Sequence, residues 1–304
     1  MRVLNFGSLN IDHVYRVDRF VQPGETKAVK AYEVFAGGKG LNQSIALARA
    51  GLRVAHAGKV GPEGDFLIKV LKQAGVETAS IGRSPLPTGH AIIQVDDEGH
   101  NCILIHGGAN RDITEAFIQR VLEVFDKGDI LVLQNEIAMP QRILELAHAK
   151  GMTLVLNPSP FEPSIAAWPL ALVDIFVLNE TEAAGLARGL ALLDAERAQD
   201  AREAARALAA RFSHALVVVT LGAEGALAIR DGSEYLQPAF KVNALDTTAA
   251  GDTFLGYLVA GIAEGRSIPD ALKLAAQAAA ICVTRKGASS SIPRRDELEQ
   301  GMTH

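Results

Sequence analysis

Short, mostly apolar segments recur along this chain and alternate with segments whose apolar residues are spaced as on one face of a helix. Such short apolar segments are typical of buried strands, and they occur at Val3–Phe6, Val54–Ala57, Ile130–Leu133, Thr153–Leu156, Ile175–Leu178 and Leu216–Val219. Helical spacing occurs at Leu41–Ala50, Phe66–Ala74, Ile118–Phe125, Arg142–Lys150 and Ala201–Arg211. This alternation predicts the α/β class, with a central, mostly parallel sheet flanked by helices on both faces. Ligands of such sheets bind outside the carboxyl ends of the strands.

Two further segments, Val14–Phe35 and His90–His106, follow a different pattern. Apolar and polar residues alternate within them around central turn residues, which is typical of exposed hairpins. We predict that they form one small second sheet, covering about residues 14–35 and 88–108, inserted in a single domain of residues 1–304. Such a sheet beside the ligand crevice would act as a lid that excludes water. A decorative edge hairpin is the alternative.

Composition narrows the classes of protein that fit this pattern. Hydrophobic residues make up 48% of the 304 residues, and the net charge of −5 comes from interspersed acids and bases, so no basic face suggests nucleic acid as a partner. No apolar run approaches the roughly 18 residues of a membrane helix, and the start of the chain reads as a strand rather than a signal peptide. Only Cys102 and Cys282 occur, so neither a disulfide framework nor a cysteine zinc site is expected. These features predict a cytoplasmic protein with no membrane partner.

The segment Asp246–Phe254 consists of small residues between two aspartates and runs into an apolar stretch that predicts a helix. Small side chains let a ligand approach the free N–H groups of a helix start, where the helix dipole favours phosphate. Because a carboxylate there repels phosphate, we interpret Asp252 as a general base for a hydroxyl that attacks it. The N–H groups of Ala249, Ala250 and Gly251 would then bind charge on the phosphoryl oxygens. The motif indicates a kinase.

Two motifs near the start of the chain offer polar groups to a sugar. Asn10 and Asp12, in the loop expected after the first strand, could hold hydroxyl groups, although both residue types are also ordinary turn formers. The segment Gly37–Gln43 leads into a helix, with glycines that allow close approach and with Lys39 and Asn42 as polar contacts. Its spacing matches neither a Walker loop nor the Gly-x-Gly-x-x-Gly dinucleotide fingerprint.

Three later turns have two interpretations each. Asn179 could contact a phosphate and Glu182 could hold Mg²⁺ through water, but the pair also fits a helix capping box, which is the commoner explanation. The turn Thr220–Gly225 could lie over a nucleotide or form a plain hairpin loop. The segment Thr284–Ser291 could bind an anion through its basic residues, or a cation through carbonyl oxygens.

Taken together and in this order, these motifs resemble the ribokinase-like (pfkB) carbohydrate kinase family, and its ribokinase branch in particular. The resemblance covers nearly the whole chain and is carried by Gly7–His13, Gly37–Gln43, Asn179–Glu182, Asp246–Phe254 and Val283–Ala288. It implies an ATP-dependent sugar kinase that phosphorylates O5 of D-ribose to give ribose 5-phosphate. It also implies a lid sheet that often pairs with its mate in a homodimer.

The resemblance further implies roles for individual residues. The sugar would be held by Asn10, Asp12, Gly38, Lys39, Asn42 and Glu136, with Asp252 at the hydroxyl to be phosphorylated. ATP would lie against Asn179, Thr220, Gly222, Gly225 and Gly251, and Glu182 would organise Mg²⁺. A K⁺ ion would bind to Asp246, the Thr248 carbonyl, carbonyls of Cys282, Arg285 and Gly287, and Ser291. This favours the cation interpretation of the Thr284–Ser291 segment.

Three departures from the ribokinase pattern bear on the substrate. Asn135 precedes Glu136 where an apolar residue is common, Gly107 replaces a typical alanine, and His90 stands where a small apolar residue is usual. Since His90 and Asn135 could alter the sugar pocket, deoxyribose, another sugar or a nucleoside are alternatives. From another class, an NAD-dependent dehydrogenase is opposed by the missing dinucleotide fingerprint. A non-catalytic sugar-binding protein would have no use for Asp252.

Overall fold

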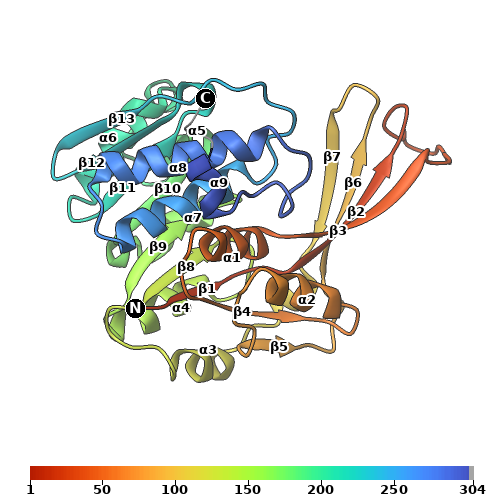
Figure 1. The fold of residues 1–304 in the computed structure, drawn as a ribbon, viewed down its shortest axis with the longest axis horizontal. Helices are drawn as coiled ribbons and strands as arrows, with labels where there is room; N and C mark the ends of the chain where they lie inside the picture. Colours follow the sequence, from red (N-terminus) through yellow and green to blue (C-terminus); the bar gives the residue numbers. More distant parts are fainter. Residues whose placement is uncertain (301–304) are drawn as a thin grey trace.

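The computed structural model describes residues 1–300 and contains a nine-stranded sheet in the order β13-β12-β11-β10-β9-β8-β1-β4-β5 (Figure 1). All neighbours from β11 to β5 are parallel, whereas β12 and β13 pair antiparallel at one edge. The predicted mostly parallel sheet is thus confirmed. Its strands are β1 (Val3–Phe6), β4 (Val54–Val60), β5 (Ile81–Arg83), β8 (Ile130–Gln134), β9 (Thr153–Asn157), β10 (Ile175–Asn179), β11 (Leu216–Thr220), β12 (Ala226–Arg230) and β13 (Ser233–Gln237).

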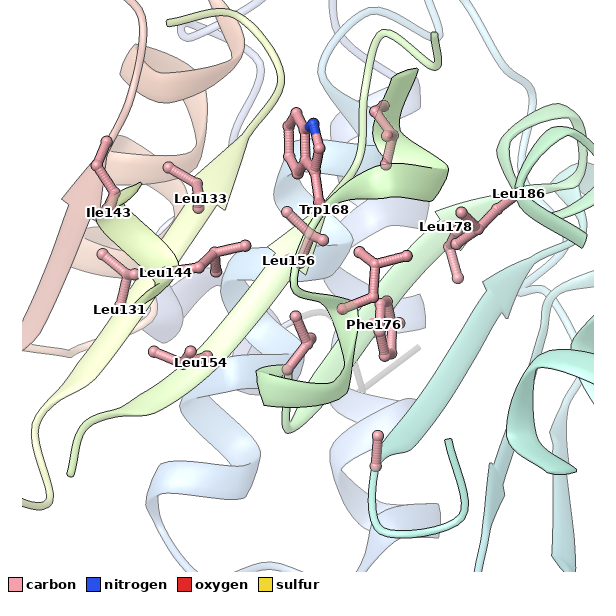
Figure 2. Packing of buried hydrophobic residues seen from close by; sticks show 14 of the residues in the cluster. Leu131, Leu133, Ile143, Leu144, Leu154, Leu156, Trp168, Phe176, Leu178 and Leu186 are labelled. Carbon is pink, nitrogen blue, oxygen red and sulfur yellow. The ribbon is translucent and has the colours of Figure 1, made fainter. Parts of the chain in front are cut away.

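Helices cover both faces of this sheet. One buried apolar cluster joins the sheet to α3 (Glu115–Leu122), α4 (Pro140–Ala149), α5 (Glu180–Gly189) and α6 (Ala201–Arg211); Figure 2 shows part of it around Trp168 and Phe176. A second cluster on the opposite face includes α1 (Lys39–Arg49), α2 (Asp65–Gln73), α7 (Ala250–Ala263), α8 (Ile268–Val283) and α9 (Arg295–Gln300). Successive residues of a strand point to opposite faces, so Leu4 belongs to the first cluster and Val3 to the second. No helix within residues 1–300 has the length and hydrophobicity needed to cross a bilayer.

Not every helix matches the sequence-based expectation. The helix predicted over Ile118–Phe125 begins earlier, at Glu115, because the Thr114 hydroxyl accepts a hydrogen bond from the Phe117 N–H (3.3 Å) and caps it there. Neither α8 nor α9 was among the predicted helical segments, although the Ser267 side chain caps the first turn of α8. Caps set helix ends more sharply than apolar spacing does.

The remaining strands form the predicted second, smaller sheet, in the order β3-β2-β6-β7. Two antiparallel hairpins are joined by a parallel pairing of β2 with β6, and the sheet stands away from the helices and the larger sheet (Figure 1). Its strands are β2 (Asn10–Arg16), β3 (Ala31–Gly37), β6 (Gly89–Val95) and β7 (Asn101–His106). The expectation that Asn10 and Asp12 lie in a loop is wrong, because both residues lie on β2, which pairs with β3 and β6.

Candidate active site

Two adjoining cavities open at the carboxyl ends of β9, β10 and β11, beside the first turn of α7. The larger has a volume of about 520 Å³ and a mostly apolar lining that includes Phe240, Val242 and Phe254. The smaller, of about 450 Å³, is lined by charged groups that include Lys39 and Asp252. The cavities form one crevice, because they share the lining residues Thr220, Gly222, Thr247 and Gly251. Its position is the one expected for a ligand site of a parallel sheet.

Asp252 lies buried in the first turn of α7, at the wall of the smaller cavity. Its Oδ1 accepts a hydrogen bond from Gln43 Nε2 (2.9 Å), and its Oδ2 accepts one from Asn42 Nδ2 (3.2 Å). The Asn42 side-chain oxygen is buried and has no hydrogen-bond partner among the described residues. Because both carboxylate oxygens are held by fixed amides, the Asp252 side chain has one defined orientation.

The start of α7 presents backbone N–H groups to the crevice. Ala249 precedes the helix with a left-handed backbone (φ 62°), and the Ala250 N–H donates to the Thr247 carbonyl (3.2 Å). The Gly251 N–H meets no acceptor among the described residues, and the space where a Cβ of Gly251 would lie is open. Of the three N–H groups predicted to bind phosphate, that of Ala250 is therefore already engaged, whereas those of Ala249 and Gly251 meet no acceptor among the described residues.

Glu136 connects the Gly-rich turn to the segment between β1 and β2. Its Oε2 accepts hydrogen bonds from the Ser8 hydroxyl and from the Lys39 backbone N–H (3.0 Å), and burial raises the pKa of its carboxyl. Burial opposes the charge of the Lys39 side chain, but Asp252, Glu136 and Glu182 outweigh it and raise the pKa of Lys39. Lys39 is thus a cation among carboxylates at the wall of the crevice.

Asn10 and Asp12 project from β2 next to glycines that make room for them. Gly89 pairs with Asn10, and a Cβ there would lie 2.4 Å from Asn10 Oδ1. A Cβ at Gly37 would lie 2.0 Å from Asp12 Oδ2. Burial, and then the charge of Glu136, raise the pKa of Asp12 to about 7.

Comparison with known proteins assigns the chain to a family. Residues 2–295 match the family described as pfkB family carbohydrate kinase. The chain belongs to this family. A ribokinase of Haemophilus influenzae is 36% identical over 305 residues, which cover 98% of this chain and 97% of that protein. A deoxyribokinase of Salmonella typhi is 32% identical over 305 residues, which cover 99% of this chain and 98% of that protein.

Solved structures give the same family and fold. A ribokinase from Cryptococcus neoformans in complex with ADP superposes with a TM-score of 0.85 at 32% identity, covering 99% of both chains. An Arabidopsis thaliana ribokinase complexed with ribose and ATP superposes with a TM-score of 0.83 at 26% identity, covering 100% of this chain and 99% of that one. The protein is therefore a carbohydrate kinase, a phosphotransferase of the ribokinase family that uses ATP. The dehydrogenase and the non-catalytic binding protein considered above are excluded.

In this pfkB-family kinase, Asn179 and Glu182 form the capping box that was one of the two interpretations. The Glu182 N–H donates to Asn179 Oδ1 (2.8 Å), and the Asn179 N–H donates to Glu182 Oε2 (3.0 Å). Both residues also line the smaller cavity. The turn Thr220–Gly225 connects the antiparallel strands β11 and β12, as a hairpin loop would, and it contributes Thr220, Gly222 and Gly225 to the lining of the larger cavity.

The two segments predicted to hold K⁺ lie side by side in the pfkB-family fold. Leu245 N–H donates to the Val283 carbonyl (2.7 Å), and Asp246 Oδ2 accepts the Gly287 N–H (2.9 Å). Asp246 Oδ1 accepts hydrogen bonds from the Thr248 hydroxyl (2.6 Å) and the Thr248 N–H (2.9 Å). Burial opposes ionisation of Asp246, but these hydrogen bonds outweigh it and lower its pKa. Asp246 therefore ties the two segments together through its carboxylate oxygens.

His90 and Asn135, the two departures that we expected to affect the sugar pocket, direct their side chains to partners other than Asp12. Asp12 pairs with Ala91 on β6, so the neighbouring His90 side chain lies on the opposite face, where its ring lies 6.0 Å from that of His13. The Asn135 side chain donates to the Pro160 carbonyl (2.8 Å).

Several residues that shape this pfkB-family site were not predicted from sequence. They are Gly89 and Asn110, which flank Asn10, and Gln43, Gln134 and Asn157, which lie behind Asp252. Gln43 directly follows Asn42 in the Gly-rich motif, which is the one local signal. The others come from distant segments.

Proposed function

We propose that this kinase transfers the γ-phosphoryl group of ATP to O5 of D-ribose, giving ribose 5-phosphate. The observation that carries this proposal is the position of Asp252, a buried carboxylate at the wall of the polar cavity next to the free N–H of Gly251. The ribokinase names of the Haemophilus influenzae relative and of the Arabidopsis thaliana structure with ribose and ATP support the choice of sugar.

In the proposed reaction, Asp252 accepts the proton of the sugar hydroxyl as its oxygen attacks the phosphorus. The Gly251 N–H, together with the Ala249 N–H, binds the charge that develops on the phosphoryl oxygens. A preorganised donor of this kind contributes about 3–4 kcal/mol to lowering the barrier. The apolar cavity by Phe240 accommodates the adenine, and the polar cavity accommodates the phosphates.

The sugar binds on the other side of Asp252. Asn10 and Asp12 offer a donor and an acceptor, and Glu136 and the unpartnered oxygen of Asn42 offer further acceptors for hydroxyl groups. Gly38 and the Lys39 side chain complete this sugar site. The four-stranded sheet, which carries Asn10 and Asp12, acts as the lid that excludes water.

Two cations belong to this proposal. Mg²⁺, when bound, neutralises phosphate charge, and Glu182 would hold it through water at the wall of the polar cavity, where Asn179 would contact a phosphate. K⁺ would be held by Asp246, the carbonyls of Thr248, Cys282, Arg285 and Gly287, and Ser291. The K⁺ site does not contact the phosphate; its residues fix the segment that carries the Gly251 N–H.

We also propose a homodimer formed through the lid sheet. Ile103, Leu104 and Ile105 on β7 are 47%, 66% and 63% exposed, which is unusual for three consecutive large apolar residues on a sheet. Light scattering of the wild type and of Ile105→Glu tests this. We expect the wild type to have the mass of a dimer and the variant that of a monomer. If the two proteins have the same mass, the proposal is contradicted.

The decisive experiment for the substrate is a panel assay with ATP, Mg²⁺ and K⁺. D-ribose, deoxyribose, ketoses and nucleosides are compared by kcat/KM, and ³¹P NMR identifies the phosphorylated position. D-ribose with a 5-phosphate product is expected. Preference for deoxyribose, the substrate named for the Salmonella typhi relative, or for a nucleoside contradicts the proposed sugar but not the kinase chemistry.

The role of Asp252 is tested separately. Loss of a general base reduces turnover by about 100- to 10,000-fold, so Asp252→Asn is expected to lose turnover to this extent while it still binds ATP. Near-normal turnover of Asp252→Asn contradicts the assignment.

A further inference from the structure

Polar side chains form a connected chain through the protein interior behind Asp252. Gln134 on β8 and Asn157 on β9 hydrogen-bond to Gln43 of α1, and Asn5 on β1 hydrogen-bonds to Gln134. Asn5, Gln43 and Gln134 are each at most 1% exposed. Buried amides are stable only with specific hydrogen-bond partners, so the directions of their donors and acceptors can be worked out one by one.

The carbonyl of Gly40 is the first fixed point of this hydrogen-bond network, because its role as an acceptor cannot change. A carbonyl only accepts, so Asn5 must present its nitrogen, Nδ2, to it (2.7 Å). Asn5 Oδ1 then faces Gln134, which donates to it through Nε2 (2.9 Å). The same Gln134 nitrogen also donates to Gln43 Oε1 (2.6 Å).

This orientation leaves Gln134 Oε1 buried without a partner among the described residues. The opposite orientation is worse, because it would place the Gln134 oxygen against the oxygens of both Asn5 and Gln43. A buried orphan acceptor is unfavourable. The direction of the Gln134 amide is therefore imposed by its neighbours.

The second fixed point is the carbonyl of Val177. Asn157 Nδ2 donates to it (3.0 Å), which turns Asn157 Oδ1 toward Gln43 Nε2 (3.0 Å). Gln43 thus has an acceptor on its nitrogen side and a donor on its oxygen side. Both fixed points require Gln43 to direct Nε2 at Asp252 Oδ1, at 2.9 Å.

We infer that Gln43 is a positioning residue for Asp252 and that Gln134 sets the direction of its amide. This inference rests on the proposed role of Asp252 as the general base. Gln43 holds Oδ1 while Asn42 holds Oδ2, so the carboxylate cannot rotate away from the sugar hydroxyl. A displacement of about 1 Å in such a group can reduce the rate by about 100-fold.

Two substitutions of Gln43 test this inference in the full-length enzyme. Gln43→Met removes the donor, and we expect kcat to fall by about 100-fold while the KM for sugar changes by less than about threefold. Gln43→Glu keeps size and shape but places a second carboxylate against Asp252. Two adjacent carboxylates share a proton, so the acid limb of the kcat–pH profile is expected to move to higher pH by about one unit or more.

A third substitution acts from behind the site. In Gln134→Glu the donor to Gln43 is lost, which favours reversal of the Gln43 amide, so kcat is expected to fall although residue 134 touches no ligand. Gln119→Glu, the same change on the exposed face of α3, serves as the matched control and is expected to leave kcat unchanged.

Thermal unfolding and ADP binding identify the variants that fold. If Gln43→Met does not fold, Gln43→Glu provides the test. Folded Gln43 and Gln134 variants with kcat within about threefold of wild type, or with a changed KM alone, overturn the inference. Asp252→Asn in the same assay separates the two hypotheses. If Asp252→Asn retains turnover, the proposed general base is wrong; if only the glutamine variants retain it, the positioning role is wrong.

Discussion

Asn110 donates a 2.7 Å hydrogen bond from its side-chain nitrogen to the side-chain oxygen of Asn10, 100 positions earlier in the chain. Its own side-chain oxygen accepts the Leu9 N–H (3.0 Å), which fixes the direction of the Asn110 amide. The bond occupies the side-chain oxygen of Asn10 and leaves its amide hydrogens for the sugar. Asn10 is therefore a donor in the proposed sugar site, and its partner on the sugar must be an acceptor.

Asn110→Ala should impair sugar binding without changing the chemistry. Loss of one oriented hydrogen bond corresponds to about 1 kcal/mol, so we expect the KM for sugar to rise about five- to tenfold with kcat nearly unchanged. Asn101→Ala on the exposed strand β7 is the control and should behave like wild type. An unchanged KM in Asn110→Ala would show that Asn10 does not depend on this bond.

Sugar binding should depend on pH through Asp12. Its pKa is raised to about 7 by burial and by Glu136, so the carboxyl is neutral below this pH and ionised above it. A sugar hydroxyl donates more strongly to the ionised carboxylate. We therefore expect the KM for sugar to fall as the pH rises from about 6 to about 8, and Asp12→Asn to have a higher KM that is insensitive to pH over this range.

The raised pKa of Asp12 also predicts an effect on stability. The unfolded group ionises near 3.8 and the folded group near 7, so the free energy of unfolding falls as the pH rises between these values. Asp12→Asn should therefore have a higher Tm than wild type at about pH 8, and a similar Tm at about pH 4. Equal differences in Tm at the two pH values would contradict this assignment.

Gly251→Ala should separate stability from activity. The space around Gly251 is free of protein atoms, and replacing glycine by alanine within a helix stabilises by about 0.5–1 kcal/mol. The new methyl group would project into the proposed phosphate site, so we expect a Tm equal to or above that of wild type together with a kcat reduced at least about tenfold. Full activity would place the phosphate elsewhere.

Activation by K⁺ should depend on the charge of Asp246. Asp246→Asn retains an acceptor for the Thr248 or Gly287 N–H but loses the negative charge beside the carbonyl oxygens. We expect the K⁺ concentration for half-maximal activity to rise about tenfold, which corresponds to about 1.4 kcal/mol. Asp231→Asn, in the exposed turn between β12 and β13, is the matched control. An unchanged response to K⁺ in Asp246→Asn would exclude Asp246 from the site.

The local pattern of the sequence predicted the larger elements well. Buried strands such as Ile130–Gln134 are almost uniformly apolar, and the start of α7 at Asp246–Phe254 combines small residues with an apolar continuation. Both signals are local, so the residues next to one another in the chain are enough to predict the strand and the helix start. Helix boundaries were less accurate at α3, where one hydroxyl at Thr114 decides the first turn.

What only the tertiary structure decided is which polar groups meet and in which direction each one donates. Asn10 is a donor because Asn110 occupies its oxygen. Gln43 donates to Asp252 because the carbonyls of Gly40 and Val177 fix the amides around it. An amide side chain looks the same in sequence in either orientation, and its partners here come from strands and helices far apart in the chain. The sequence by itself determined the residue types of this site, whereas packing of the two sheets and their helices gave each polar atom its role.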